Sequence, residues 1–325
     1  MADSSPPAPP RAPRGRFHNR YQRFDHGPSW ELVKFLWKMR AWRPARVTLP
    51  QRRPDVAWLK ANRSVDALTW IGHASFLLQV GGLNVLTDPH LTERASPLAF
   101  GEPRRANPPA LDFADLPKID AVVVSHNHYD HLDLVTVRRL AAEHAPVFFV
   151  PLGLKDWFVR ARIDCEVHEL DWWQQAAHRG MTVHAVPVQH FSGRTASDRN
   201  RTLWCGFVLE VRGRKVFFAG DTGYSRDFID IRQRFGPMDL SLLPIGAYDP
   251  RGFMAPVHVN PAEAVQIHRD LECRQSVAMH WGTFRLTLEP LDEPPQQLAT
   301  ALAAAGIAPE KFVVMQHGET TKPVW

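Results

Sequence analysis

Residues 126–131 read His-Asn-His-Tyr-Asp-His, which places four metal-ligand side chains within six positions. They follow an apolar run at 121–124 that has the character of a buried strand. Residues two positions apart in an extended segment point the same way, so the first two histidines can bind one cation. The aspartate and the last histidine are displaced along the chain, toward a second cation. The four residues are His126, His128, Asp130 and His131.

The chemistry of these side chains favours a pair of metal ions. Imidazole nitrogen and carboxylate oxygen suit zinc, and iron and manganese are the alternatives. Two such ions about 3.5 to 4 Å apart hold both the attacking and the leaving oxygen of a hydrolytic reaction. Core packing gives no reason to place three histidines and an aspartate directly after a buried strand. The run therefore predicts a two-metal hydrolytic site.

Further residues of ligand type follow other predicted strands. Asp221 enters a Gly-Asp-Thr-Gly turn whose glycines permit close backbone approach to a ligand or ion, and His280 also follows a strand. Asp88 follows a third strand, where its carboxylate either orients a ligand imidazole or caps a turn. His258 precedes Asn-Pro-Ala-Glu at 260–263, a helix start with an asparagine N-cap. A histidine at that place can face a substrate.

The chain after residue 66 alternates short apolar runs with turn signals, which predicts a strand-rich domain with helices at intervals. The predicted strands lie at 68–78, 83–86, 121–124, 147–150, 182–186, 204–211, 215–219, 240–244, 276–279 and 311–315. The predicted helices lie at 134–144, 154–162, 228–235, 261–271 and 295–305. This pattern indicates sheets sandwiched between helical layers.

The His-x-His-x-Asp-His run is the signature of the metallo-β-lactamase superfamily, and the chain resembles that family. Within it, the chain is similar to the branch of phospholipase D enzymes that hydrolyse N-acylphosphatidylethanolamine. The similar segments occur in the same order at 70–74, 87–89, 125–133, 150–154, 169–173, 189–190, 217–224, 244–248 and 280–284. They cover most of residues 67–320 and are weakest before residue 67 and at 193–201. The resemblance implies an α/β fold, an αββα sandwich of two mixed sheets flanked by helices.

The resemblance also implies roles for particular residues. One metal is expected on three histidines and the other on an aspartate and two histidines, with Asp221 bridging both. The first set is His126, His128 and His190, and the second is Asp130, His131 and His280. His73 is expected near the site, with a packed core histidine as the alternative. Asp130 and His258 are the expected catalytic residues, and Asp88 and His73 the expected supports of the metal ligands.

The function implied by the resemblance is hydrolysis of phospholipids like N-acylphosphatidylethanolamine. A hydroxide held between two zinc ions would attack phosphorus and release phosphatidic acid and an N-acylethanolamine. Another hydrolase of the same fold, acting on a lactone, a cyclic phosphodiester or a nucleic acid, would keep the ligands and change the pocket. A non-catalytic metal-binding protein is disfavoured by the complete ligand set.

The excess positive charge lies at the N-terminus. Residues 1–55 hold 12 of the 39 Lys and Arg but only 4 of the 34 Asp and Glu, which leaves 27 against 30 elsewhere. A basic arm suits an anionic partner. Because the arm lacks an RNA-binding motif and the body is slightly acidic, that partner is expected to be phospholipid and not nucleic acid. The predicted domains are a basic flexible arm at 1–56 and a hydrolase domain at 57–325.

The arm itself has two parts. Residues 1–28 are rich in Pro, Arg and small residues, which predicts a flexible tail. Residues 29–44 begin with a serine N-cap, end with a proline, and predict a short helix. Three tryptophans beside Lys and Arg are typical of a helix lying in a lipid headgroup layer. A helix docked on the body or on a second subunit, as in a homodimer, is the alternative.

The three cysteines are widely spaced and odd in number, so neither a disulfide framework nor a CxxC metal motif is available. The chain has no secretory signal core and no run of about 18 apolar residues. These features predict a reducing compartment. The expected location is cytoplasmic, with peripheral attachment to the inner membrane face.

Overall fold

Two seven-stranded sheets form the centre of the molecule. The computed structural model describes residues 15–23, 30–41, 47–98, 100–195 and 197–325. The first sheet has the order β14-β1-β2-β3-β4-β5-β6 and the second β13-β12-β11-β10-β9-β8-β7. The first comprises β1 (Ala67–Gly72), β2 (Ser75–Val80), β3 (Leu83–Thr87), β4 (Ala121–Val123), β5 (Val147–Pro151), β6 (Val167–Leu170) and β14 (Thr320–Thr321). The second comprises β7 (Gln175–His178), β8 (Met181–Val186), β9 (Gly206–Val211), β10 (Arg214–Phe218), β11 (Leu240–Pro244), β12 (Gln275–Met279) and β13 (Phe312–Val313).

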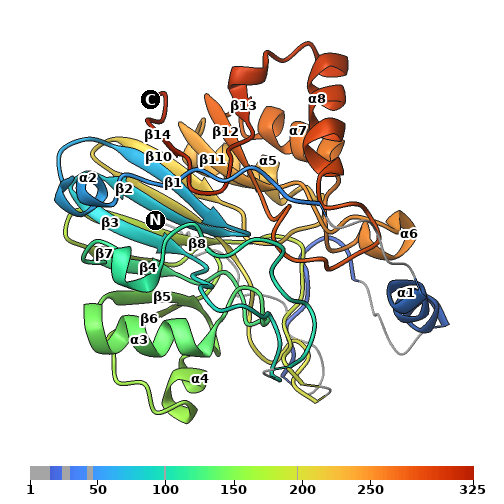
Figure 1. Ribbon diagram of the computed structural model, residues 1–325, viewed down its shortest axis with the longest axis horizontal. Coiled ribbons are helices and arrows are strands. Elements are labelled where there is room, and N and C mark those ends of the chain that lie inside the picture. Colours follow the sequence, from blue (N-terminus) through green and yellow to red (C-terminus); the bar gives the residue numbers. More distant parts are fainter. Residues whose placement is uncertain (1–14, 24–29, 42–46, 99, 196) are drawn as a thin grey trace, which may run out of the picture.

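Helices cover the outer faces of both sheets, which confirms the predicted αββα sandwich (Figure 1). The first sheet is covered by α3 (Leu134–His144) and α4 (Lys155–Arg160), and the second by α5 (Asp227–Phe235), α7 (Pro261–Asp270) and α8 (Glu293–Ala305). Shorter elements are α2 (Val56–Ala61), α6 (Arg251–Met254) and the 3-10 turns η1 (Phe113–Asp115) and η2 (Pro309–Lys311). Both sheets are mixed, because antiparallel pairs give way to parallel pairs at β3·β4 and at β10·β11.

The strands are apolar on both faces because each face meets a different core. In β5, Val147 and Phe149 lie in the core between the two sheets, whereas Phe148 and Val150 lie in the core beneath α3 and α4. The strand therefore reads as a continuous apolar run and not as an alternation. This character makes such strands easy to predict from the sequence.

The strand predictions are wrong at two kinds of place. The range predicted at 68–78 divides into β1 and β2, because His73 adopts a φ of 55° and the chain turns there. The sequence pattern does not predict β6, β7 or β14. The first two are partly exposed strands at sheet edges with polar residues on them, and the third is only two residues long.

Residues 15–23, which we call the strap, pack against the sandwich. The side chain of Phe17 is 2% exposed and that of Asn19 is 7% exposed. The prediction of a flexible tail over 1–28 is therefore wrong for the strap, because one aromatic ring and one amide find buried partners in a segment of otherwise polar composition. The rest of that predicted tail lies outside the described residues.

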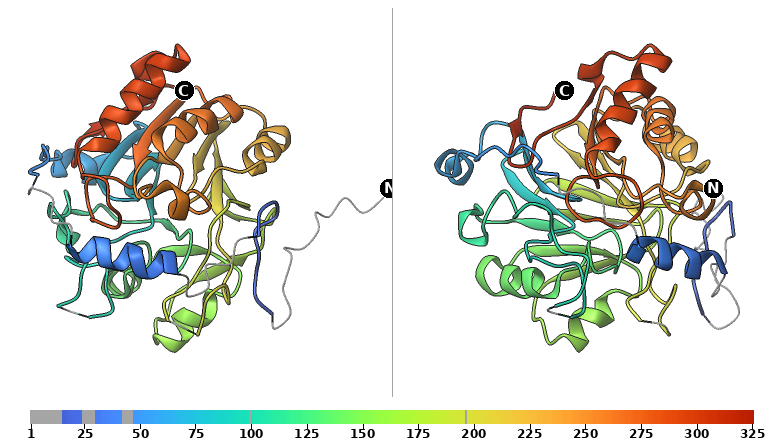
Figure 2. Two further views of the ribbon diagram at one scale, coloured as in Figure 1. Left: turned by 90° about the vertical axis from the view of Figure 1, so that its right-hand side faces the viewer. Right: turned by 45° about the vertical axis from the view of Figure 1, so that its right-hand side comes forward.

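The helix predicted at 29–44 is confirmed as α1 (Trp30–Ala41), although its predicted serine cap and proline stop lie outside the described residues. It lies across the loops at one end of the sandwich (Figure 2). Among the helices in the described ranges, none has the length and hydropathy needed to cross a membrane.

The start of α7 has the capping box predicted from its sequence. Asn260 Oδ1 accepts a hydrogen bond from the backbone N–H of Glu263, and the Glu263 carboxylate accepts one from the backbone N–H of Asn260. These contacts satisfy helix N–H groups that have no partner within the helix.

We expect the substitution Asn260→Ala to lower the free energy of unfolding by about 1 kcal/mol, because it removes the acceptor for the Glu263 N–H. Equilibrium urea unfolding measures this change. Gln297→Ala, at an exposed position inside α8, is the control and should change the stability by less than about 0.5 kcal/mol. Equal stabilities of the Asn260 variant and the wild type would contradict the capping role.

Candidate metal centre

The residues of ligand type meet at one edge of the sandwich, where the strands that carry them end. Asp88 follows β3, and the run 126–131 follows β4, which is parallel to β3. Asp221 and His280 follow β10 and β12, and both strands are parallel to β11 between them. Because parallel strands end on the same side, each sheet delivers its polar loops to the same place.

Four donor atoms form the first group. The side chains of His126, His128, His190 and Asp221 each offer one atom, and these atoms all lie within 4.8 Å of one another. His128 Nδ1 lies 2.8 Å from His126 Nε2 and 3.3 Å from His190 Nε2. Metal–nitrogen bonds of about 2.0 to 2.1 Å in a tetrahedron place neighbouring donors about 3.3 Å apart. The group therefore has the dimensions of a tetrahedral metal site.

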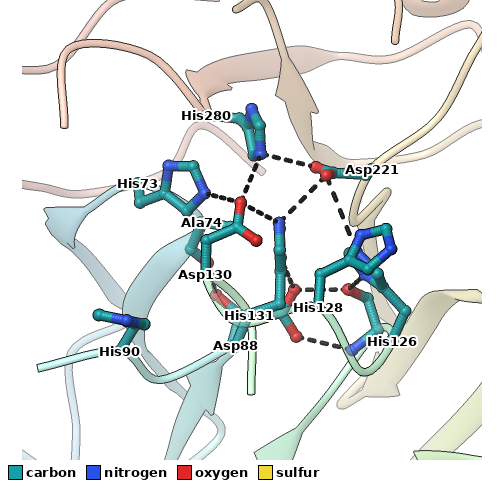
Figure 3. A network of polar contacts seen from close by, with 12 residues as sticks. His73, Ala74, Asp88, His90, His126, His128, Asp130, His131, Asp221 and His280 are labelled. Carbon is teal, nitrogen blue, oxygen red and sulfur yellow. Dashed lines mark hydrogen bonds and ion pairs between the residues drawn. The ribbon is translucent and has the colours of Figure 1, made fainter. Parts of the chain in front are cut away.

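The second group lies beside the first (Figure 3). Its members are His73, Asp130, His131 and His280. Asp130 Oδ2 lies 3.3 Å from His131 Nε2 and 3.5 Å from His280 Nε2. His131 Nε2 and His280 Nε2 are buried and have no hydrogen-bond partner among the described residues. Unpartnered nitrogens at such a spacing fit a metal ion.

Asp221 lies between the two groups. Its Oδ1 is 3.0 Å from His280 Nε2 and its Oδ2 is 3.1 Å from His131 Nε2, both in the second group. The same Oδ2 is 3.7 Å from His190 Nε2 and 3.9 Å from His126 Nε2, in the first group. The carboxylate is thus placed to contact a cation on either side.

Hydrogen bonds on the far side of three rings fix their tautomers. His131 Nδ1 donates to Asp88 Oδ2 at 2.6 Å, so of the two roles expected for Asp88 the structure shows the support of a ligand imidazole. Ser125 Oγ donates to the same oxygen at 2.5 Å, so it accepts from His126 Nδ1 at 2.8 Å. His190 Nδ1 donates to the Val257 carbonyl at 2.9 Å. Each ring therefore uses Nδ1 for this hydrogen bond and directs Nε2 into the site.

The three imidazole rings of the first group are neutral. Burial, which disfavours the charged form, lowers the pKa of His128 to about 4. Burial also holds the pKa of His126 and of His190 well below the ordinary value, against the attraction of Asp221. Each ring therefore keeps a lone pair for a metal.

The second group attracts positive charge. Burial opposes protonation of His280, yet the carboxylates of Asp221 and Asp130 raise its pKa to about 9. The same carboxylates raise the pKa of His131 well above the ordinary value. Burial likewise opposes ionisation of both aspartates, but attraction to His131 holds the pKa of each well below the ordinary range. A divalent cation would supply the same compensation as the two ring protons.

The two remaining predicted residues also reach the site. His73 Nε2 lies 2.9 Å from Asp130 Oδ2, with its ring centre 4.0 Å from that of His280. His258 Nδ1 lies 4.0 Å from Asp221 Oδ2, is buried, and has no hydrogen-bond partner in the described part of the chain. Burial lowers the pKa of His258 to about 4, so the ring is neutral. Every site residue predicted from the sequence is thus within one cluster.

The backbone around the site is tightly constrained. His73, Asp88 and His280 have φ values of 55°, 32° and 60°, in a region that residues other than glycine rarely adopt. Gly220 has a φ of 58°, and an added Cβ there would lie 2.5 Å from Ser125 Cβ. The sequence predicts that Gly220 permits close approach to an ion. In the structure, its lack of a side chain instead allows the Asp221 turn to lie close to the histidine-rich loop at 126–131.

Sequence reasoning does not identify Arg194, which holds the histidine-rich loop in place. Its guanidinium donates to the carbonyls of Asn127 at 2.9 Å and Leu132 at 2.8 Å, and it lies over the ring of Tyr129. Arg194 belongs to the Ser- and Arg-rich segment 193–201. That this segment follows His190 in the sequence is what could have placed it near the site. Ser125 and Asn19 are likewise absent from the predicted site.

Comparisons with known proteins agree with this geometry. Residues 83–281 match the family described as the beta-lactamase superfamily domain. The chain is 43% identical over 279 residues to an uncharacterised protein of Mycobacterium tuberculosis, covering 84% of this chain and 72% of that protein. It is 39% identical over 263 residues to N-acyl-phosphatidylethanolamine-hydrolyzing phospholipase D 1 of Caenorhabditis elegans, covering 77% of this chain and 74% of that protein.

Solved structures show the same fold at low sequence identity. A possible metal-dependent hydrolase of Veillonella parvula superposes with a TM-score of 0.63 and 19% identity, covering 80% of this chain and 100% of that one. The family match spans well over half of the chain and includes the residues from His126 to His280. The chain therefore belongs to the metallo-β-lactamase superfamily of metal-dependent hydrolases.

Proposed function

We propose that the protein is a two-zinc phosphodiesterase that hydrolyses N-acylphosphatidylethanolamine-like phospholipids in the manner of a phospholipase D. The observation that carries this proposal is the pair of donor groups that share Asp221. The name of the Caenorhabditis elegans relative supports the substrate class. Iron and manganese are the alternative metals for the same donors.

The residues present fit two metal ions. His126, His128 and His190 would hold one ion, and a second trio would hold the other, with Asp221 between them. That second trio is Asp130, His131 and His280. When bound, the ions lower the pKa of water to give a nucleophile and neutralise charge on phosphoryl oxygens.

The protein's own groups position the reaction. His73 lies at hydrogen-bond distance from Asp130 and thereby fixes this carboxylate of the second group. His258 is neutral and can donate one ring N–H toward a phosphoryl oxygen that gains charge. A preorganised donor of this kind, in a buried position, stabilises the transition state more than the substrate.

Two substitutions should separate metal binding from catalysis. We expect Asp221→Ala to reduce the metal content from about two equivalents to one or fewer and to abolish turnover, because both groups lose a ligand. We expect His258→Ala to keep both metals and to lower kcat by about 10²- to 10³-fold. Plasma mass spectrometry measures zinc, iron and manganese, and steady-state kinetics measures turnover.

His168→Ala is the matched control, because His168 contacts Glu166 outside both donor groups. It should retain the metals and the activity of the wild type. Full metal content together with full turnover in the Asp221 variant would disprove the bridging role.

The substrate proposal is tested with three phosphodiesters. We expect the zinc-loaded protein to convert N-acylphosphatidylethanolamine into phosphatidic acid and an N-acylethanolamine, and to act more slowly on phosphatidylcholine. In H₂¹⁸O the label should enter phosphatidic acid, because water attacks phosphorus. Turnover of bis(p-nitrophenyl) phosphate without turnover of either lipid would keep the metal chemistry and reject the phospholipase activity.

The helix α1 is suited to contact a lipid surface. One face docks on the sandwich, where Phe35 stacks on Phe253 with ring centres 5.4 Å apart. The opposite face leaves Trp30 69%, Val33 53% and Trp37 70% exposed. These three residues recur at helical spacing. The sequence offers two interpretations of this helix, docking on the body and contact with a lipid headgroup layer. The two interpretations therefore apply to opposite faces of the helix.

We propose that this exposed face enters the headgroup layer of a phospholipid membrane. Lys34 and Lys38 flank it on the polar side, as expected for a helix that lies on an anionic surface. The same proposal explains how an enzyme without a spanning helix in its described part would reach a bilayer lipid. It also accounts for the basic composition of the arm.

We expect the double variant Trp30→Ala/Trp37→Ala to bind vesicles of phosphatidylethanolamine and phosphatidylglycerol at least about tenfold more weakly than the wild type, because two large apolar side chains are lost. Vesicle flotation measures the bound fraction. The control is Val135→Ala/Val159→Ala, which alters exposed apolar residues on α3 and α4. Equal binding by all three proteins would remove the membrane role of α1.

A further inference from the structure

The strap makes contacts that concentrate on one residue of the first donor group. Asn19 Nδ2 donates to the His190 carbonyl at 2.9 Å, and Asn19 Oδ1 accepts from the His190 backbone N–H at 3.0 Å. A single buried side chain thus satisfies both backbone groups of a proposed metal ligand. Asn19 lies 171 residues away in the sequence. No secondary-structure partner does this, since His190 lies outside the strands of both sheets.

Neighbouring contacts keep Asn19 in place. Trp204 Nε1 donates to Asn19 Oδ1 at 3.1 Å, and Gln189 Nε2 donates to Gln22 Oε1 at 3.1 Å. Arg20 bridges to Asp227 at 2.9 Å and to Asp230 at 2.7 Å, which fastens the strap to α5. Figure 2 shows the strap in dark blue beside the yellow loops at this end of the sandwich.

We infer that Asn19 is a positioning residue for the metal in the first donor group. It fixes the backbone of His190, while the Val257 carbonyl fixes the ring, and together they set the direction of Nε2. Loss of the amide leaves a buried N–H and a buried carbonyl without partners, and such groups shift to recover hydrogen bonds. The imidazole then shifts with its backbone. This inference rests on the metal assignment of the proposed function.

The effect is confined to one metal. Asn19 contacts none of the residues proposed for the second ion, Asp130, His131 and His280, in the hydrogen bonds of the described chain. Trp204 keeps a second acceptor, the Val188 carbonyl at 2.9 Å, when Asn19 is removed. His190 is therefore the contact that changes most.

The experiment compares zinc release from full-length, zinc-loaded variants to a chromophoric chelator. For Asn19→Ala we expect one zinc to leave about 10- to 100-fold faster than in the wild type and the other at the wild-type rate, because supports of metal ligands contribute affinities of that size. The Co²⁺-substituted variant should show an altered visible absorption spectrum. Neither readout depends on a substrate.

Arg20→Ala is the matched control, because it removes two ion pairs between the strap and α5 but leaves both Asn19 hydrogen bonds to His190 in place. It should release both ions at wild-type rates. Equal acceleration in the two variants would assign the effect to docking of the whole strap and overturn the role of Asn19. Unchanged release from Asn19→Ala would overturn it as well.

Asn19→Asp serves if the alanine variant does not fold. It keeps an acceptor for the His190 N–H and for Trp204, but it cannot donate to the His190 carbonyl, so faster release of one zinc is again expected. Wild-type release from this variant would refute the inference. The metal content of the wild type is measured before any variant is compared. A wild-type protein that binds no metal would refute the proposed function and not the role of Asn19.

Discussion

The site depends on one electrostatic constraint, the burial of the Asp221 carboxylate beside two further carboxylates. Asp88, Asp130 and Asp221 are each at most 9% exposed, and an uncompensated buried charge is among the least favourable arrangements in a protein. Imidazole rings surround these carboxylates. On one side they are neutral and offer lone pairs, and on the other they are held ready to carry positive charge. Such an arrangement is stable only with cations or protons between the carboxylates. The cluster therefore attracts positive charge even without a substrate.

The same constraint explains the architecture. No single strand end can supply seven donors, so the two sheets contribute loops that follow β4, β8, β10 and β12. The two sheets have the same sequence of antiparallel and then parallel strands, which brings these ends to one edge. The convergence requires strained backbone at His73, Asp88 and His280, at a cost of about 1 to 3 kcal/mol each. The continuous core between the sheets holds these loops in place and offsets that strain.

The sequence predicts those residues of the site whose positions follow from the nearby secondary structure. The run 126–131, Asp221 and His280 lie within two positions of the ends of predicted apolar strands, so their meeting at a sheet edge follows from strand direction. His190 lies farther from its strand, because residues 187–189 separate it from β8, and only the family resemblance points to it. Arg194 and Asn19 escape prediction for a related reason. Their roles arise from contacts, across 62 or more residues, with backbone carbonyls and amides, and the main chain of a loop carries such groups whatever its side chains are.

These contacts show that the site extends beyond residues 83–281, the segment that matches the family. The family match at 83–281 includes all seven proposed ligands, but neither His73 nor Asn19 lies within it. His73 reaches Asp130 from the β1–β2 turn, and Asn19 reaches His190 from the strap, so each donor group has one support from outside the matched segment. The strap and α1 come from the same basic arm, yet the strap faces inward with polar contacts and α1 faces outward with tryptophans. Under the two proposals, the same basic arm serves the metal centre through Asn19 of the strap and a lipid surface through the exposed face of α1.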